Sequence, residues 1–130
     1  MILLTHPPQV RENYYSDQAL AGLMALAEVR RNPLEREWSS AELIAAARGC
    51  DIIVTHRHVP GDAPLFASLP GLVAFCRCAA DIRNVDVAAA SRHGVLVTQA
   101  SAGFIPATAE WVLGAMIDLG RRISISTEHY

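Results

Sequence analysis

Residues 72–122 decide the fold of this chain, and they divide into four segments. The segments read LVAFCRCA (72–79), DIRNVDVAAASRHG (81–94), VLVTQA (95–100) and SAGFIPATAEWVLGAMIDLGRR (101–122). The first and third are short runs rich in apolar and β-branched residues, which predict buried strands. The second and fourth contain apolar residues at helical spacing and predict a short and a long helix. This order favours parallel strands covered by helices.

Three earlier segments extend the same alternation toward the N-terminus. Residues 1–5 (MILLT), 28–32 (EVRRN) and 51–55 (DIIVT) predict strands, with helical spacing between them. Right-handed crossovers then predict an α/β fold with a flavodoxin-like, doubly wound parallel five-stranded sheet in the order 2-1-3-4-5. A long C-terminal helix is expected to follow the sheet.

Local signals indicate where several helices begin and end. Ser39 and Glu42 have the spacing of a capping box, and Gly49 suits the C-terminal end of the helix that they open. Asp86 is expected to cap the short helix that follows it. Pro106 suits the first turn of the final helix, which is expected to run to about residue 123.

Composition excludes several classes of function. The chain has 130 residues, 52% of them hydrophobic and 18% charged, which predicts one folded domain rather than disorder. A net charge of −2 gives no reason to expect nucleic acid or an anionic membrane as a partner. All basic residues are arginine, so mechanisms that need a lysine are excluded. Three cysteines without a signal peptide predict reduced thiols and a cytoplasmic location.

Short motifs bear on two classes of ligand. No three glycines have the Gly-x-Gly-x-x-Gly spacing of a dinucleotide site. His56-x-His58 and Cys76-x-Cys78 follow neighbouring predicted strands, and two nitrogens with two sulfurs would suit zinc. Alternating residues on a buried strand are more often packed thiols, and closed zinc sites usually have longer cysteine spacing. No metal site is therefore expected.

The loop after the fourth predicted strand carries a family resemblance. Residues 77–86 read RCAADIRNVD, residues 97–101 read VTQAS, and residues 102–111 read AGFIPATAEW. This ordered set resembles the D-isomer-specific 2-hydroxyacid dehydrogenases (phosphoglycerate dehydrogenase-like). Their corresponding segments typically read Arg-x-Gly-x-Gly-x-Asp-Asn-Ile-Asp, then Val-x-Asn-Ala-Pro, then Gly-Gly-Asn-Thr before a helix that begins Ser-Ala-Ala-Glu-His.

The resemblance implies a division of the chain and of its chemistry. Residues 1–105 would be the substrate-binding domain, and residues 106–130 the interdomain helix and the start of a nucleotide-binding domain that does not follow. The family's catalytic Arg, His and Glu lie in that other domain, so no catalytic residue is expected here and the chain alone is expected to be inactive. NAD or NADP would serve the full-length parent, with none bound to this chain.

The resemblance also implies a site for the carboxylate of a small 2-keto or 2-hydroxy acid. Its residues would be His56, Arg57, Arg77, Ala79, Ala80, Asp81 and Phe104. Backbone N–H groups at Ala80 and Asp81 would hold the carboxylate, with Arg77 and the His56–Arg57 pair lining the same cleft. The alternative for Arg77 is a salt bridge to Asp86 or Asp81.

Three departures from the family pattern indicate an unusual substrate or a divergent subfamily. Asp81 replaces a glycine and places negative charge where a carboxylate would bind. Arg83 replaces an aspartate, and we expect it to offset Asp81 as an ion pair. Phe104 replaces an asparagine that contacts substrate in related formate-type enzymes.

Two further alternatives follow from the final helix. Its apolar stripe consists of Ala109, Val112, Leu113, Met116, Ile117 and Gly120. In the family this helix has a partner in the second domain, so we expect a homodimer in which the helices pack on each other or swap. The alternative is a monomer whose helix folds back over the sheet edge. The alternative function is a stand-alone, non-enzymatic module for small carboxylates or self-association.

Overall fold

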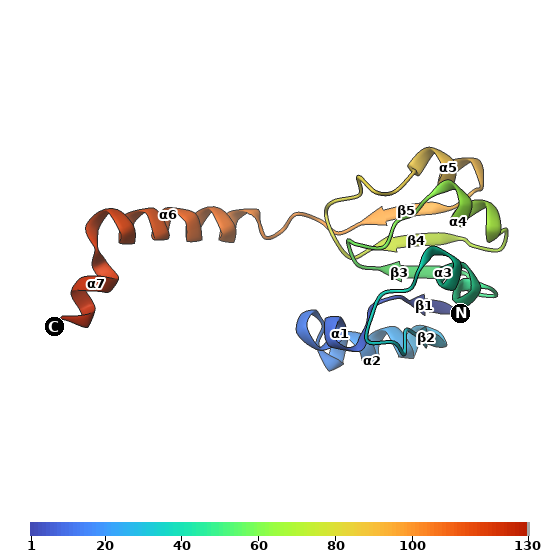
Figure 1. Cartoon of the computed structure of the whole chain (residues 1–130), viewed down its shortest axis with the longest axis horizontal. Helices are drawn as coiled ribbons and strands as arrows, with labels where there is room; N and C mark the ends of the chain where they lie inside the picture. The colour runs from blue at the N-terminus through green and yellow to red at the C-terminus, as the bar shows by residue number, and fades with distance from the viewer. Residues whose placement is uncertain (130) are drawn as a thin grey trace. The chain divides into compact units, whose positions relative to one another are not determined.

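Strands and helices alternate in a computed structural model, which describes residues 1–129 and only the backbone of Tyr14 (Figure 1). The strands are β1 (Ile2–Leu4), β2 (Val29–Arg31), β3 (Ile52–Thr55), β4 (Ala74–Arg77) and β5 (Leu96–Gln99). The helices are α1 (Pro8–Tyr14), α2 (Asp17–Leu26), α3 (Ser40–Ala47), α4 (Ala63–Ser68), α5 (Val87–Arg92), α6 (Ile105–Arg121) and α7 (Ile123–Glu128).

The five strands form one sheet in the order β2-β1-β3-β4-β5, with every neighbouring pair parallel. The predicted fold class and strand order are therefore confirmed. Register places Leu3, Ile53 and Phe75 in one row across the sheet, and all three side chains are fully buried. A parallel sheet needs covering helices because its crossovers run over its faces.

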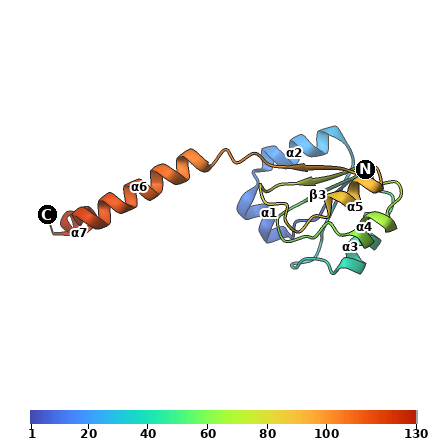
Figure 2. The same cartoon turned by 90° about the horizontal axis from the view of Figure 1, so that it is seen from above.

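The helices cover the two faces unequally. Figure 2 shows α2 on one face and α3, α4 and α5 on the other. The three-helix face contains the core, in which α3 contributes Leu43 and α4 contributes Phe66. Along the α2 face, Ile2, Leu4 and Ala74 are buried, whereas Leu96 of β5 is 61% exposed and is not covered by another element of residues 1–100. An exposed apolar residue at the end of a sheet leaves room for another element.

The predicted helix ends are confirmed in detail. Both hydrogen bonds of the capping box join Ser39 and Glu42. Asp86 accepts a hydrogen bond from the Ala89 N–H at the start of α5. Gly49 follows α3 with φ of +76°, a left-handed conformation that disfavours residues with a Cβ atom.

Two helices differ from the prediction. Residues 8–14 form α1, a separate helix before α2 that the sequence did not predict. Pro8 stands in the first turn, where its missing N–H costs no helical hydrogen bond. The final helix ends at Arg121, and Arg122, with φ of +55°, separates it from α7.

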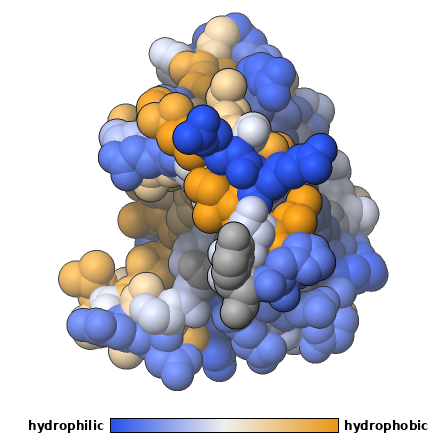
Figure 3. Space-filling model, turned by 90° about the vertical axis from the view of Figure 1, so that its left-hand side faces the viewer, coloured by the Kyte–Doolittle hydropathy of each residue, from blue (hydrophilic) through white to orange (hydrophobic). Residues whose placement is uncertain are grey.

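The chain divides into two compact units, Met1–Ala100 and Ser101–Tyr130. The second unit contains α6 and α7, and the Asp118 carboxylate joins them by accepting hydrogen bonds from the Ser124 N–H and hydroxyl. Apolar residues lie at its surface, among them Leu113, which is 59% exposed. Figure 3 shows apolar side chains (orange) among hydrophilic ones on the side of the molecule that faces the viewer. No helix within the described part of the chain is both long and apolar enough to cross a membrane.

Candidate functional site

Two loops meet where β3 and β4 reach their carboxyl ends. The Arg77 guanidinium, at the end of β4, donates hydrogen bonds to the carbonyl oxygens of His56 and Val59 and to Asn84 Oδ1. Asn84 Nδ2 donates in turn to the Arg57 carbonyl at 3.0 Å. The loop after β3 and the loop after β4 are therefore held together by the side chains of Arg77, which was a predicted site residue, and Asn84, which was not.

Arg77 is buried beneath this edge, with 2% of its surface exposed. Its partners are backbone carbonyls and an amide, and no ion pair within residues 1–129 joins it to Asp81 or Asp86. The salt-bridge alternative for Arg77 is therefore wrong. The two Nη atoms order the loops, whereas the buried Nε atom has no hydrogen-bond partner among the described residues.

The loop after β4 presents four consecutive backbone N–H groups without a partner. Among the hydrogen bonds of the described residues, none uses the N–H of Ala79, Ala80, Asp81 or Ile82 as a donor. The amides on either side of this run are satisfied, since the Cys78 N–H donates to the Thr55 carbonyl and the Arg83 N–H to the Asp81 carboxylate. Adjacent free amides in a turn are a suitable cradle for an anion.

The expected ion pair between Asp81 and Arg83 is confirmed. Arg83 Nη2 donates to Asp81 Oδ2 at 2.7 Å, and Arg83 Nε contacts both carboxylate oxygens. The Arg83 guanidinium and N–H hold the pKa of the Asp81 carboxyl well below its usual range. The negative charge that replaces the family's glycine is thus offset within the loop itself.

The other predicted site residues lie in different environments. Arg57 is exposed beside this loop, whereas His56 is buried. Ala79 and Ala80 are half-buried. Phe104 belongs to the second compact unit and is largely exposed there.

A histidine cluster lies at the neighbouring carboxyl ends of β1 and β3, and the sequence predicted only part of it as a site. His6 and His56 lie with ring centroids 5.1 Å apart, and His6 Nε2 contacts the Tyr15 hydroxyl at 2.8 Å. Glu37, from the loop after β2, reaches His58 Nδ1 at 3.2 Å. His6 was not among the predicted site residues, because its contact with Tyr15 depends on helix α1, which the sequence did not predict. Pro8 in a first helical turn was the available signal.

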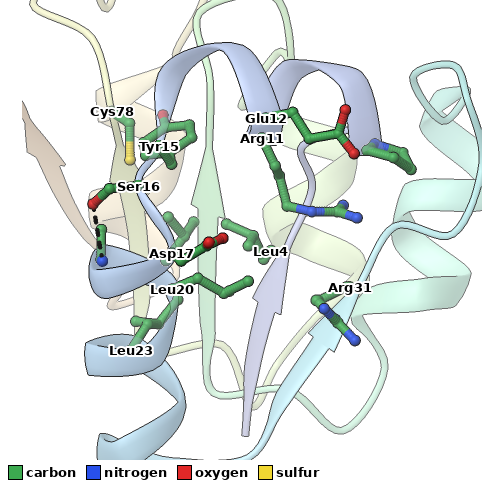
Figure 4. A pocket seen from close by; sticks show the side chains of 13 residues that line it. Leu4, Arg11, Glu12, Tyr15, Ser16, Asp17, Leu20, Leu23, Arg31 and Cys78 are labelled. Atoms are coloured by element: carbon green, nitrogen blue, oxygen red, sulfur yellow. Dashed lines mark hydrogen bonds between the residues drawn. The ribbon is translucent and has the colours of Figure 1, made fainter.

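A cavity of about 380 Å³ lies on the α2 side of the sheet. Figure 4 shows Leu4, Leu20 and Leu23 along its wall, with Tyr15 and Cys78 on one side and Arg31 on the other. None of the seven predicted site residues lines it. The cavity thus touches the loop after β4 at Cys78, next to the residues with the free amides.

Comparison with known proteins decides the family. The family model described as "D-isomer specific 2-hydroxyacid dehydrogenase, catalytic domain" matches residues 2–129. The chain belongs to this family. Its parallel sheet and the loop after β4 are accordingly features of a 2-hydroxyacid dehydrogenase domain.

Individual relatives agree with this assignment. D-3-phosphoglycerate dehydrogenase of Mycobacterium leprae is 32% identical over 83 residues, which are 64% of this chain and 16% of that protein. Solved structures share the fold: D-lactate dehydrogenase of Escherichia coli has a TM-score of 0.67 at 22% identity over 98% of this chain and 39% of that one. The TT0316 protein of Thermus thermophilus has a TM-score of 0.71 at 22% identity over 99% and 40%. The chain thus spans a minor part of the length of each.

The buried His6 predicts a loss of stability in acid for this dehydrogenase domain. Burial, with smaller contributions from His56 and Arg11, lowers the pKa of His6 to about 4 from its ordinary 6.5. Below pH 6.5 the unfolded chain binds a proton that the folded protein accepts only near pH 4. Stability is therefore full above pH 6.5 and falls as the pH drops toward 4, by about 2–3 kcal/mol for this residue.

Urea unfolding at several pH values between 7 and 4.5 tests this expectation. The variant His6→Gln should show a shallower dependence of the unfolding free energy on pH, whereas His93→Gln, at an exposed position, should keep the wild-type slope. An unchanged slope in His6→Gln would assign the acid sensitivity to other groups.

Proposed function

We propose that this chain is the substrate-binding part of an NAD(P)-dependent D-2-hydroxyacid dehydrogenase, which interconverts a 2-keto acid and the D-2-hydroxy acid. Its membership of the family supports the reaction class. The observation that carries the role of this part is the run of unused N–H groups at Ala79, Ala80 and Asp81. Three free cysteines agree with work in a reducing cytoplasm.

The substrate carboxylate would lie over this loop. Oriented N–H groups bind a carboxylate because each donates a charge-assisted hydrogen bond. No positively charged side chain has to be buried for this binding. Arg57, exposed on the adjoining loop, would add a positive charge, while buried Arg77 would hold the two loops at their correct spacing. His56 would add to the wall of the site.

A titration of the ¹⁵N-labelled protein with glyoxylate or hydroxypyruvate tests the site. We expect the amide resonances of Ala79, Ala80 and Asp81 to shift together, and Arg57→Ala to weaken binding about tenfold, near the low end for hydrogen bonds to charged groups. The control Arg92→Ala removes an exposed arginine at the end of α5 and should leave the affinity unchanged. Shifts confined to residues around the α2-side cavity would contradict the proposed site.

The cofactor is expected to need residues beyond these 130. We expect the chain alone to bind NADH with a dissociation constant above about 10 μM and to leave NADH unoxidised in the presence of 2-keto acids. The reason is that no glycine-rich dinucleotide turn occurs in the sequence. Calorimetry with NADH and a spectrophotometric assay measure the two quantities, and tight binding or turnover would refute the expectation.

A second candidate function is a non-enzymatic module that binds small carboxylates or associates with itself. The exposed apolar residues of α6 favour self-association. Glyoxylate binding without any gain in activity when a nucleotide-binding domain of this family is supplied would support the module over the enzyme.

A further inference from the structure

Three potential metal ligands from two loops converge beside the proposed carboxylate site. Glu37 lies in the loop between β2 and α3, and His56 and His58 follow β3. One ligand atom of each lies within 4.8 Å of the other two. Glu37 Oε1 is 3.2 Å from His58 Nδ1 and 3.5 Å from His56 Nε2.

These two distances match the spacing of ligands around zinc. Zinc bonds to histidine nitrogen and carboxylate oxygen are about 2.0–2.1 Å long, so ligand atoms at tetrahedral angles lie about 3.3–3.4 Å apart. Small side-chain rotations would bring the third pair of atoms to the same spacing. Glu37 and His58 are partly open to solvent, which gives an ion a path to the site.

A second observation points to a ligand at this position. His56 is 8% exposed, and its Nε2 atom is buried without a hydrogen-bond partner among the described residues. The Glu37 carboxylate is near enough to attract a positive charge there but too distant for a good hydrogen bond. A buried ring nitrogen without a partner is costly unless a ligand satisfies it.

We propose that Glu37, His56 and His58 bind a divalent transition metal ion, and that zinc fits this site best. Two imidazoles and one carboxylate are a ligand set that zinc accepts, with a water molecule in the fourth position. The ion would join the loop before α3 to the end of β3 and would face the loop that carries the free amides. This inference goes beyond substrate binding and does not depend on it.

Metal binding requires one change in the hydrogen bonding of His56. Its Nδ1 atom now accepts a contact of 3.4 Å from the His58 N–H. With Nε2 bound to the ion, neutral His56 carries its proton on Nδ1, so this contact is lost. Because 3.4 Å is at the edge of hydrogen-bond range, the loss is small compared with a new metal bond.

The proposed ligands differ from the zinc ligands that the motifs His56-x-His58 and Cys76-x-Cys78 would supply together. Cys76 and Cys78 do not join the cluster of potential ligands found among residues 1–129. Cys78 lines the cavity on the α2 side instead. Glu37 is the ligand that motif reading missed, since it lies far from both histidines in sequence.

Calorimetric titration of the metal-free protein with Zn²⁺, without any 2-keto acid present, tests the site. We expect one ion per chain with a dissociation constant below about 10 μM, and visible absorption bands from Co²⁺ in a site of low coordination number. His58→Asn should weaken zinc binding at least about thirtyfold, because losing even an outer partner of a metal ligand costs about 10–100-fold. Glu37→Gln should weaken it at least about tenfold.

Two control variants make the test specific. His93→Asn removes an exposed histidine outside the cluster, and the double variant Cys76→Ser/Cys78→Ser removes the alternative thiol ligands. Both should bind zinc as the wild type does. Failure of the wild type to bind zinc at 100-fold excess, unchanged binding by His58→Asn, or loss of binding in the cysteine double variant would each overturn the proposal. Circular dichroism confirms that every variant is folded.

Discussion

Replacing Arg77 with alanine is expected to lower the free energy of unfolding by about 3–5 kcal/mol, a large part of the stability of a domain of this size. The substitution removes the donor from two carbonyl oxygens and from Asn84 Oδ1. The carbonyl oxygens of His56 and Val59 are then left without a partner at buried positions, at a cost of about 1–3 kcal/mol each, whereas the exposed Asn84 can bond to water. The loops after β3 and β4 would also lose the contacts that join them.

Urea unfolding followed by circular dichroism measures this loss. The control is Arg83→Ala, since Arg83 is an exposed arginine in the same loop whose partner is the Asp81 carboxylate. Its midpoint should remain close to that of the wild type. Arg77→Lys keeps the charge but cannot form the same fork of donors, so an intermediate midpoint is expected. A wild-type midpoint for Arg77→Ala would show that the buried guanidinium does not hold the loops together.

The intact chain is expected to be a homodimer at tens of micromolar. Val112, Leu113, Met116 and Ile117 form an apolar stripe on α6, and each is at least 45% exposed. Burial of about 400 Å² of such surface would contribute about 10 kcal/mol at about 25 cal/mol per Å², before the cost of association. The uncovered end of the sheet at Leu96 provides further apolar surface for a partner.

Light scattering of the wild type and of Leu113→Glu measures this association. The variant places a charge in the stripe and should be monomeric at the same concentration. Ala107→Glu adds the same charge on the other side of the helix, in its first turn where an acidic residue is favourable, and should remain dimeric. A monomeric mass for the wild type would contradict the expected dimer.

The sheet could be predicted from the sequence because every strand except β2, which reads VRR, is a short apolar run with a helix or a loop on either side. Chain order and the handedness of crossovers then left few arrangements, and the order with β1 between β2 and β3 was among them. Helix α1 was missed because its sequence, PQVRENY, has little apolar periodicity. Its position is fixed by contacts such as that between His6 and Tyr15, which no local pattern reveals.

The sequence predicted which loops form the candidate site, but it predicted the role of each residue in those loops less well. The family resemblance of the loop after β4 implied the amides of Ala80 and Asp81 as the carboxylate site, which stays a prediction, and the expected pair of Asp81 with Arg83 is confirmed. In the structure Arg77 is buried and Arg57 is exposed. The sequence alone does not show which of two arginines becomes buried in the fold. Glu37 became a neighbour of His56 only through tertiary structure, since the loop before α3 lies over the end of β3.

The central position of β1 has a consequence for how the chain is made on the ribosome. Residues 2–4 leave before the other strands of the sheet, yet they pair with β2 on one side and with β3 on the other. A pair of parallel strands alone is marginal in water, so β1 and β2 cannot form a stable unit by themselves. The nascent chain should therefore need β3 and β4 before it folds, and until then its apolar N-terminal segment is open to chaperones and to aggregation.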